Sequence, residues 1–338
     1  MCKDYEPMKK ITSKVLTISI AAYNVQDSIR NTIDSLVNIP DDYLDKIEIL
    51  VVDDGSKDDT SKIVSDYKKY NSVKLISKKN GGYGSTINVS LSEAHGKYFK
   101  QLDAGDQFCT ENICAFISYL EDCDSDLVLS PYLRHYFQSE IDELVDRNKH
   151  IFKTKIDINS LKNLDELHMH EITIKTDIAK TNGIHITEKC FYTDTEFAFY
   201  SLMFSNTISK FDKPIYRYYI GEEGQSVSVL GRKKHWKDSG KMSRKLIQDY
   251  TNNIFNGAKD ESLLDTLITS VCFHIENCLL INSAEGKKEA TDTIDFIKSN
   301  CKKLESSIIK KRGNKKIKIF ILFGRKSYKF LLKCIRMK

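Results

Sequence analysis

The sequence lacks the cysteine spacings that build metal or redox sites. Its nine cysteines include no CxxC pair and no cysteine–histidine cluster at zinc-ligand spacing. Scattered cysteines of this kind are typical of reduced, buried or half-buried thiols in a cytosolic protein. We therefore expect neither a zinc centre nor a disulfide framework.

Signals for export and for membrane crossing are missing as well. Residues 1–14 have no uninterrupted apolar core like that of a signal peptide, and no run of eighteen apolar residues occurs. These absences predict a cytoplasmic protein that does not cross the membrane. Because there are only four prolines and no Gly/Ser linker or repeat, the 338 residues offer no clear domain boundary.

Positive charge is scarce in the body of the chain and concentrated at its end. Residues 301–338 hold fourteen Lys or Arg and one Glu, which leaves 38 basic and 46 acidic residues before them. A mildly acidic body argues against nucleic-acid binding, which needs positive charge over a wide surface. The tail 310–338 mixes basic with apolar residues. It is either a helix on an anionic membrane surface or a solvated tail that packs on the preceding helices.

The sequence does contain a regular alternation of strand-like and helix-like segments over its first 130 residues. Short apolar runs predict strands at 15–23, 46–54, 73–77 and 97–104, and apolar residues at helical spacing predict helices at 25–37, 57–70 and 85–94. This order predicts an α/β fold with a mostly parallel sheet and helices on its faces. From about residue 232 the pattern is mostly helical.

Polar clusters follow three of the four predicted strands. They are Tyr23-Asn24, residues 53–56 and residues 103–106. Ligands of such sheets bind beyond the carboxyl ends of the strands. Taken alone, Asp53 and Asp54 are explained about equally well by a turn that caps a helix and by contacts to a ribose or a base.

A glycine-rich segment, KKNGGYGSTIN at 78–88, leads into the third predicted helix. Its three glycines would let backbone amides approach a phosphate at the helix N-terminus. The segment matches neither the P-loop nor the GxGxxG pattern. By itself it does not distinguish a phosphate site from a plain connection.

The segments SIAAYNVQDSIRNTIDSL, EILVVDDGSKDDT and NGGYGSTINVSLSEAHGKYFKQLDAGD, in this order, resemble the family 2 glycosyltransferases. These are inverting enzymes of the GT-A fold that use nucleotide sugars. The resemblance continues through 168–178, 189–200 and 215–228. It implies a GT-A domain at 1–228, followed by a mainly helical region at 229–338. It also implies transfer of a sugar, in the first place from a UDP-sugar, to a glycan, a lipid-linked glycan or a cell-surface polysaccharide precursor.

The resemblance assigns donor-binding residues. Asp54 matches the carboxylate that contacts the base or ribose, and Ala22 and Tyr23 match the wall of the nucleotide pocket. The other donor-binding residues that it implies are Asp53, Gly82, Asp103 and Ala104.

The acidic motif departs from the family pattern. That pattern is Asp-x-Asp-Asp, in which the third position binds Mg²⁺ or Mn²⁺, but here the third position is Gly105. Three explanations stay open. Asp103 and Asp106 hold the ion directly or through water, since a hard cation keeps much of its hydration shell. Alternatively, metal dependence is weakened, or the chain is an inactive relative that only binds sugar nucleotides.

Asp194 matches the catalytic base of the family, at the start of a helix. Inversion is a direct displacement, so a carboxylate must take the proton of the attacking hydroxyl. Glu196 is the second candidate for this role, and simple helix capping by Asp194 is the alternative.

Further residues are candidates for contact with the acceptor or the diphosphate. His168 and His170 alternate in HMHEITI, which predicts that both point to the same side of a strand. The candidates are His170, Glu196, Arg217, Gln225 and Ser226.

Hypotheses from two other functional classes remain. A nucleotidyltransferase would need a basic glycine-rich loop directly after the first strand, where AAYNVQD has none. A non-catalytic sugar-nucleotide-binding protein, degenerate at Gly105, remains the alternative. Donor hydrolysis or transfer distinguishes it from an enzyme.

Overall fold

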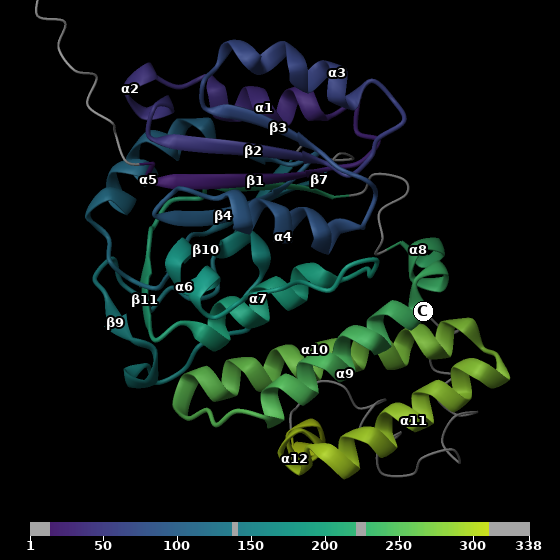
Figure 1. Cartoon of the computed structure of the whole chain (residues 1–338). Coiled ribbons are helices and arrows are strands. Elements are labelled where there is room, and N and C mark those ends of the chain that lie inside the picture. Colours follow the sequence, from purple (N-terminus) through teal and green to yellow (C-terminus); the bar gives the residue numbers. More distant parts are fainter. Residues whose placement is uncertain (1–13, 137–140, 221–227, 311–338) are drawn as a thin grey trace, which may run out of the picture.

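The computed structural model describes residues 14–136, 141–220 and 228–310, and its centre is an eight-stranded sheet (Figure 1). Four parallel strands lie side by side in the order β3-β2-β1-β4. Their bounds are Val73–Ser77, Ile47–Asp53, Leu16–Ala22 and Tyr98–Asp103. The predicted mixed α/β class with a parallel core is confirmed.

The same sheet continues beyond β4 with shorter strands of mixed direction. In sheet order they are β10 (Ile172–Lys175), β6 (Leu127–Leu129), β11 (Thr207–Lys210) and β9 (Ile156–Asp157). β10 runs antiparallel to both of its neighbours, β4 and β6.

A second, four-stranded sheet, of order β5-β12-β7-β8, was not predicted. Its strands are β5 (Gln107–Phe108), β12 (Tyr216–Ile220), β7 (Tyr132–Tyr136) and β8 (Ile141–Val145). Because β5 starts directly after Asp106, this sheet brings residues 216–220 to the acidic motif at the end of β4.

Helices cover the central sheet because its strands are apolar on both faces. In β2, Ile49 and Val51 on one face and Leu50 and Val52 on the other are all fully buried, as a two-sided core requires. The helices between the strands are α1 (Ile29–Val37), α2 (Asp41–Leu44), α3 (Thr60–Ser65), α4 (Tyr83–Glu93), α5 (Thr110–Asp122), α6 (Thr176–Thr181) and α7 (Thr193–Phe204).

The C-terminal part is helical, as predicted, and lies against the side of the molecule that carries α7 (Figure 1). It comprises α8 (Val229–Lys234), α9 (Trp236–Thr251), α10 (Gly257–Ile281), α11 (Ala284–Asn300) and α12 (Lys302–Lys310). The division at 228/229 remains a prediction. Of the basic tail 310–338, for which the sequence leaves membrane contact open, residues 311–338 lie outside the described residues.

Helix α10 is long and apolar enough to cross a membrane by length and composition. However, 67% of its apolar stretch is buried inside the protein, where it packs against α7, α9, α11 and α12. Burial on several sides explains its composition as that of a core helix. The seven cysteines in the described ranges are free thiols.

The expected strand through His168 and His170 is wrong at its start. Met169–Glu171 form a 3₁₀ turn, and β10 begins only at Ile172. The turn closes because the amide of Glu171 donates to the carbonyl of His168, while the amide of His168 donates to the Glu171 carboxylate at 3.2 Å.

Helix α4 packs so closely on the chain before α7 that Gly84→Ala should be strongly destabilising. A Cβ there would lie 2.3 Å from the carbonyl oxygen of Thr187, a backbone atom that cannot rotate away. We expect a loss of about 3 kcal/mol in the free energy of unfolding, measured by urea titration. Gly183→Ala is the control, because its φ of +65° costs about 1 kcal/mol but its Cβ would meet no atom within 4 Å in the part of the chain that the structure describes. Equal losses in the two variants would contradict this account of the contact.

Candidate active site

The polar residues predicted at the strand ends meet at one edge of the sheet. In the parallel register Ala22 of β1 lies beside Asp53 of β2, and Ala21 lies beside Asp103 of β4. The side chain of Tyr23, the next residue after β1, is 47% exposed at this edge. The candidate donor residues of the first, second and fourth predicted strands are therefore neighbours in space.

Asp54 fastens the glycine-rich segment to this edge. Its Oδ1 accepts hydrogen bonds from Lys78 Nζ at 2.7 Å and from the Gly81 amide at 2.9 Å, and its Oδ2 accepts from the Gly82 amide at 2.7 Å. The carboxylate is almost fully buried. Gly82 has a φ of +83°, which glycine adopts without strain and which turns the chain into α4.

Asp53 organises the turn that follows β2. Its carboxylate accepts from the amide of Ser56 at 2.9 Å and from the hydroxyl of Ser61. Ala22 is buried, and its carbonyl accepts from the amide of Asp54 at 2.8 Å. Both acidic residues of the DDGS turn thus hold the backbone that surrounds the site.

Asp103 and Asp194 approach each other from β4 and from the first turn of α7. Asp103 accepts a hydrogen bond from the Tyr83 hydroxyl at 2.6 Å. Burial, together with the neighbouring Asp194 carboxylate, raises the pKa of Asp103 to about 6. Desolvation also raises the pKa of Asp194, although its side chain is open to solvent. Two carboxylates that repel each other favour a cation or a proton between them.

The carboxylate of Asp106 is hydrogen-bonded to residues of the second sheet. Its Oδ2 accepts from the Tyr216 hydroxyl at 2.5 Å, and its Oδ1 accepts from the Tyr219 amide at 2.9 Å. The Tyr216 hydroxyl also accepts from the amide of Asp103 at 3.2 Å. Asp106 therefore ties β12 to the end of β4 and is 5% exposed.

Gly105 leaves open space between the two aspartates. Its φ is +122°, and among the described residues a Cβ built there would meet just one atom within 4 Å, the Ser28 hydroxyl at 3.8 Å. Its amide donates to the Thr32 hydroxyl at 3.0 Å, which holds the turn in place. The backbone conformation explains why glycine suits this position.

The carboxylates suit a metal ion that binds together with a diphosphate. Among the described residues, they do not form a complete metal site by themselves. Within the described ranges no three His, Cys, Asp or Glu residues are grouped closely enough to hold a metal by themselves. Mg²⁺ is commonly held by one or two carboxylates together with substrate phosphates and water. Asp103, beside the repelling Asp194, supplies such a donor.

An aromatic wall stands beside Asp106. The ring of His170 lies 5.0 Å from that of Tyr132, 4.8 Å from that of Tyr216 and 4.4 Å from that of Tyr218. Burial lowers the pKa of His170 well below its usual value, so the ring is neutral. His168 also faces Tyr132, whose hydroxyl is 3.0 Å from Nδ1 of His168.

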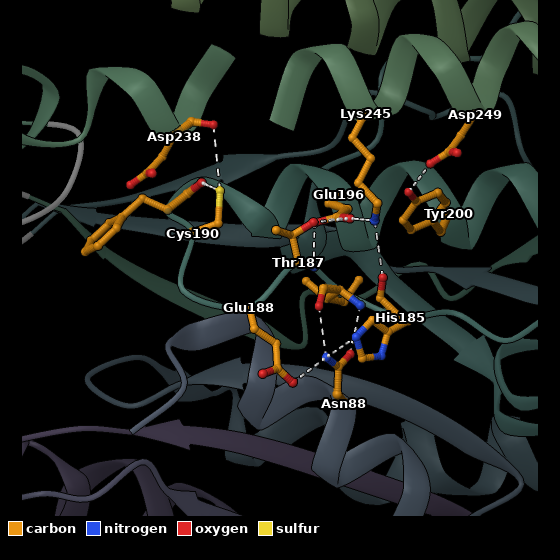
Figure 2. A network of polar contacts seen from close by, with 12 residues as sticks. Asn88, His185, Thr187, Glu188, Cys190, Glu196, Tyr200, Asp238, Lys245 and Asp249 are labelled. Atoms are coloured by element: carbon orange, nitrogen blue, oxygen red, sulfur yellow. Dashed lines mark hydrogen bonds and ion pairs between the residues drawn. The ribbon is translucent and has the colours of Figure 1, made fainter. Parts of the chain in front are cut away.

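The remaining candidates lie elsewhere or outside the described residues. Side chains alternate along β12, so Arg217 points away from the Tyr216 and Tyr218 side and pairs with Asp142 at 3.3 Å. Glu196 is fully buried and faces Thr187 and Lys245 (Figure 2). A separation of two residues places it about 200° around α7 from Asp194. Ala104 is half-buried in the acidic turn. Gln225 and Ser226 lie in 221–227, outside the described residues.

Sequence reasoning missed three side chains that shape the site: Lys78, Tyr83 and Tyr216. Lys78 and Tyr83 flank the two adjacent glycines, so a signal was visible in KKNGGYGS. Tyr216 had none, because its role depends on the second sheet.

A family profile described as "Glycosyl transferase family 2" matches residues 17–182. The chain belongs to this family. The match covers the strands and loops that form the acidic edge, and it ends before α7.

Three curated relatives of this family member illustrate the sequence similarity. Two are uncharacterized glycosyltransferases. The one from Mycoplasma genitalium is 37% identical over 29% of this chain and 34% of its own length. The one from Mycoplasma pneumoniae is 28% identical over 60% of this chain and 64% of its own length. A teichoic acid poly(glycerol phosphate) polymerase of Staphylococcus epidermidis is 25% identical over 72% of this chain and 33% of its own length. The chain thus spans between a third and two thirds of these relatives.

Solved structures show that this member of family 2 has the GT-A fold. S. aureus TarS 1–349 in complex with UDP-GlcNAc has a TM-score of 0.68 at 17% identity, over 96% of this chain and 92% of that one. A mannosyltransferase from Pyrobaculum calidifontis in complex with GDP-Man and Mn²⁺ has a TM-score of 0.53 at 13% identity, over 98% and 90%.

Replacing the two acidic residues of the motif by asparagine should change the stability of the fold in opposite directions. Asp103→Asn removes a charge that burial and Asp194 disfavour, so we expect the melting temperature at pH 7.5 in EDTA to rise by about 2 °C or more. The folded-state pKa exceeds that of the unfolded chain, so this gain should grow as pH rises from about 4 to 6 and then level off.

Asp106→Asn weakens the hydrogen bonds to Tyr216 and Tyr219 and should lower the free energy of unfolding by about 1–3 kcal/mol. Thermal melts over pH 4–8 measure both variants. Stabilisation by Asp106→Asn together with destabilisation by Asp103→Asn would contradict the geometry described here.

Proposed function

We propose that the protein is an inverting glycosyltransferase. It moves a sugar from a nucleotide-diphosphate donor, in the first place a UDP-sugar, to a hydroxyl of a glycan or cell-surface polysaccharide precursor. The family match and the likeness in fold to a UDP-GlcNAc complex support the donor class. The observation that carries the proposal is the convergence of Asp103 and Asp194 beside a glycine-rich loop fixed by Asp54.

The donor is proposed to bind along the ends of β1, β2 and β4. Tyr23 offers an exposed ring beside the base, while Asp53 and Asp54 shape the turns that surround the nucleotide. The donor residues of the proposal are Ala22, Tyr23, Asp53, Asp54, Gly82, Asp103 and Ala104.

Asp103 is the proposed ligand of Mg²⁺ or Mn²⁺, and Asp106 supports it through Tyr216 or through water. A bound divalent ion would offset the negative charge that develops on the departing diphosphate. The open space at Gly105 leaves room for water to complete the coordination of the ion.

Asp194 is the proposed base. It is open to solvent at the start of α7, so an acceptor hydroxyl can reach it. Its raised pKa makes it a better proton acceptor than an ordinary aspartate. Glu196 is left out of this role because its carboxylate is buried and hydrogen-bonded to Thr187.

The acceptor is proposed to approach along the His170 and Tyr218 wall. Aromatic rings of this kind pack on the apolar faces of sugars, and the neutral His170 adds no charge. A cytoplasmic location, with the basic tail at the inner face of the membrane, would bring the enzyme to a lipid-linked acceptor.

Donor turnover tests the proposal. Purified protein with a panel of UDP- and GDP-sugars, in Mg²⁺, Mn²⁺ or EDTA, should release nucleoside diphosphate in a metal-dependent way. Asp194→Asn should lower the rate by a factor of about 10²–10⁴. Asp177→Asn is the matched control, because Asp177 is also in the first turn of a helix but is exposed on α6.

The alternative, a protein that binds sugar nucleotides without turning them over, predicts another pattern. Calorimetry would then detect donor binding, while no diphosphate appears even with mixed glycan acceptors. That combination would reject the enzyme and make Gly105 the site of lost function.

A further inference from the structure

The chain between α6 and α7 lies directly on the glycine-rich segment. The loop of residues 184–190 is joined to it by backbone and amide contacts. The Lys189 amide donates to the Gly81 carbonyl at 2.7 Å. Asn88 of α4, which lies below the loop in Figure 2, exchanges two hydrogen bonds with the backbone of Ile186, at 2.8 and 2.9 Å.

The 184–190 loop and the glycine-rich segment are packed too closely for a side chain to fit between them. A Cβ on Gly82 would lie 3.1 Å from the Lys189 amide nitrogen, and the close approach of Gly84 to Thr187 was described above. The adjoining Gly81 and Gly82 amides bind Asp54, and Tyr83 binds Asp103. A shift of the 184–190 loop therefore moves groups that shape the proposed donor site.

Glu196 anchors the 184–190 loop from α7. Its two carboxylate oxygens accept from the Thr187 amide at 2.9 Å and from the Thr187 hydroxyl at 3.0 Å. The side chain is fully buried, and a buried carboxylate of this kind needs a cation. The cation is Lys245 of α9, which also donates to the His185 carbonyl at 3.4 Å.

Polar contacts bridge α7 and α9 around Lys245. A cavity of about 410 Å³ opens there, between the 183–185 backbone, the C-terminal half of α7 and α9. The Lys245 amine lies 4.9 Å from the centre of the Tyr200 ring, and the Tyr200 hydroxyl donates to Asp249 (Figure 2).

Lys245 thus links α9 both to Glu196, which holds the 184–190 loop, and to the His185 carbonyl in that loop. The Cys190 thiol of the loop makes a longer contact, 3.7 Å, to the Asp238 carbonyl of α9.

We propose that Lys245 is a positioning residue of the transferase. Lys245 binds Glu196, and Glu196 holds the 184–190 loop in place. This loop contacts the glycine-rich segment and also leads into the first turn of α7, which carries Asp194. The inference rests on the proposed function and goes beyond it. The family match ends at residue 182, so α9 adds a support that the matched region does not contain. The C-terminal helices then belong to the catalytic unit.

Kinetics of Lys245→Met test the proposal. We expect donor KM to rise and kcat/KM to fall by about tenfold or more, at temperatures well below the melting transition. Lys245→Arg keeps a cation within reach of Glu196 and should recover most of the loss. Lys241→Met is the matched control, since Lys241 is exposed one turn earlier on α9, and it should behave as wild type.

A double variant separates positioning from stability. Lys245→Met alone leaves the Glu196 charge buried without its cation, whereas Glu196→Gln with Lys245→Met removes both charges and should recover the melting temperature. If Lys245 positions the loop, donor KM stays raised in the double variant because the contacts of Lys245 with Glu196 and His185 are still absent. Recovery of KM together with the melting temperature would overturn the proposal.

Hydrogen exchange gives a readout that does not need activity. In Lys245→Met the amides of Gly81, Thr187 and Lys189 should exchange about tenfold faster, while the amides of β1 should stay as in Lys241→Met. Unchanged exchange at these three amides would overturn the proposal. If the wild type proves inactive with every donor, the proposed function fails, yet the exchange experiment still decides whether Lys245 holds the loop.

Discussion

The buried carboxylate of Asp54 is the constraint on which the rest of the site depends. A charge with so little exposure is stable only when it is fully hydrogen-bonded, and Lys78 with the Gly81 and Gly82 amides meets that need. These bonds hold the glycine-rich segment in one arrangement, start α4, and carry Tyr83 to Asp103. The edge of the sheet is therefore organised before any donor arrives, as efficient electrostatic catalysis requires.

The negative charge at the centre of the candidate site comes from Asp103 and Asp194. The missing carboxylate at Gly105 does not leave this place without negative charge, because Asp194 adds to it from α7. Asp106 instead binds Tyr216 of the second sheet, whose hydroxyl also accepts from the Asp103 amide, so the two aspartates of the motif have different partners. The Lys245–Glu196 pair is a second buried charge that needs a partner, and it connects the 184–190 loop, which contacts the glycine-rich segment, to α9.

Periodicity predicted the parallel strands and the helices between them, because local apolar patterns decide which faces are buried. It also placed the acidic residues at the carboxyl ends of β2 and β4. The second sheet had no such signal: β5 has two residues, and β12 meets it from more than 100 positions away in the chain. Partners such as Tyr216 for Asp106, or Lys245 for Glu196, depend on tertiary contacts that no local pattern encodes.

The stereochemistry of donor hydrolysis tests the central claim most directly. With a donor whose sugar is α-linked, proton NMR in the first minutes resolves which anomer of the free sugar appears before mutarotation. Direct displacement by a water that Asp194 activates predicts the β anomer first. Initial release of the α anomer would contradict the displacement, and with it the role given to Asp194.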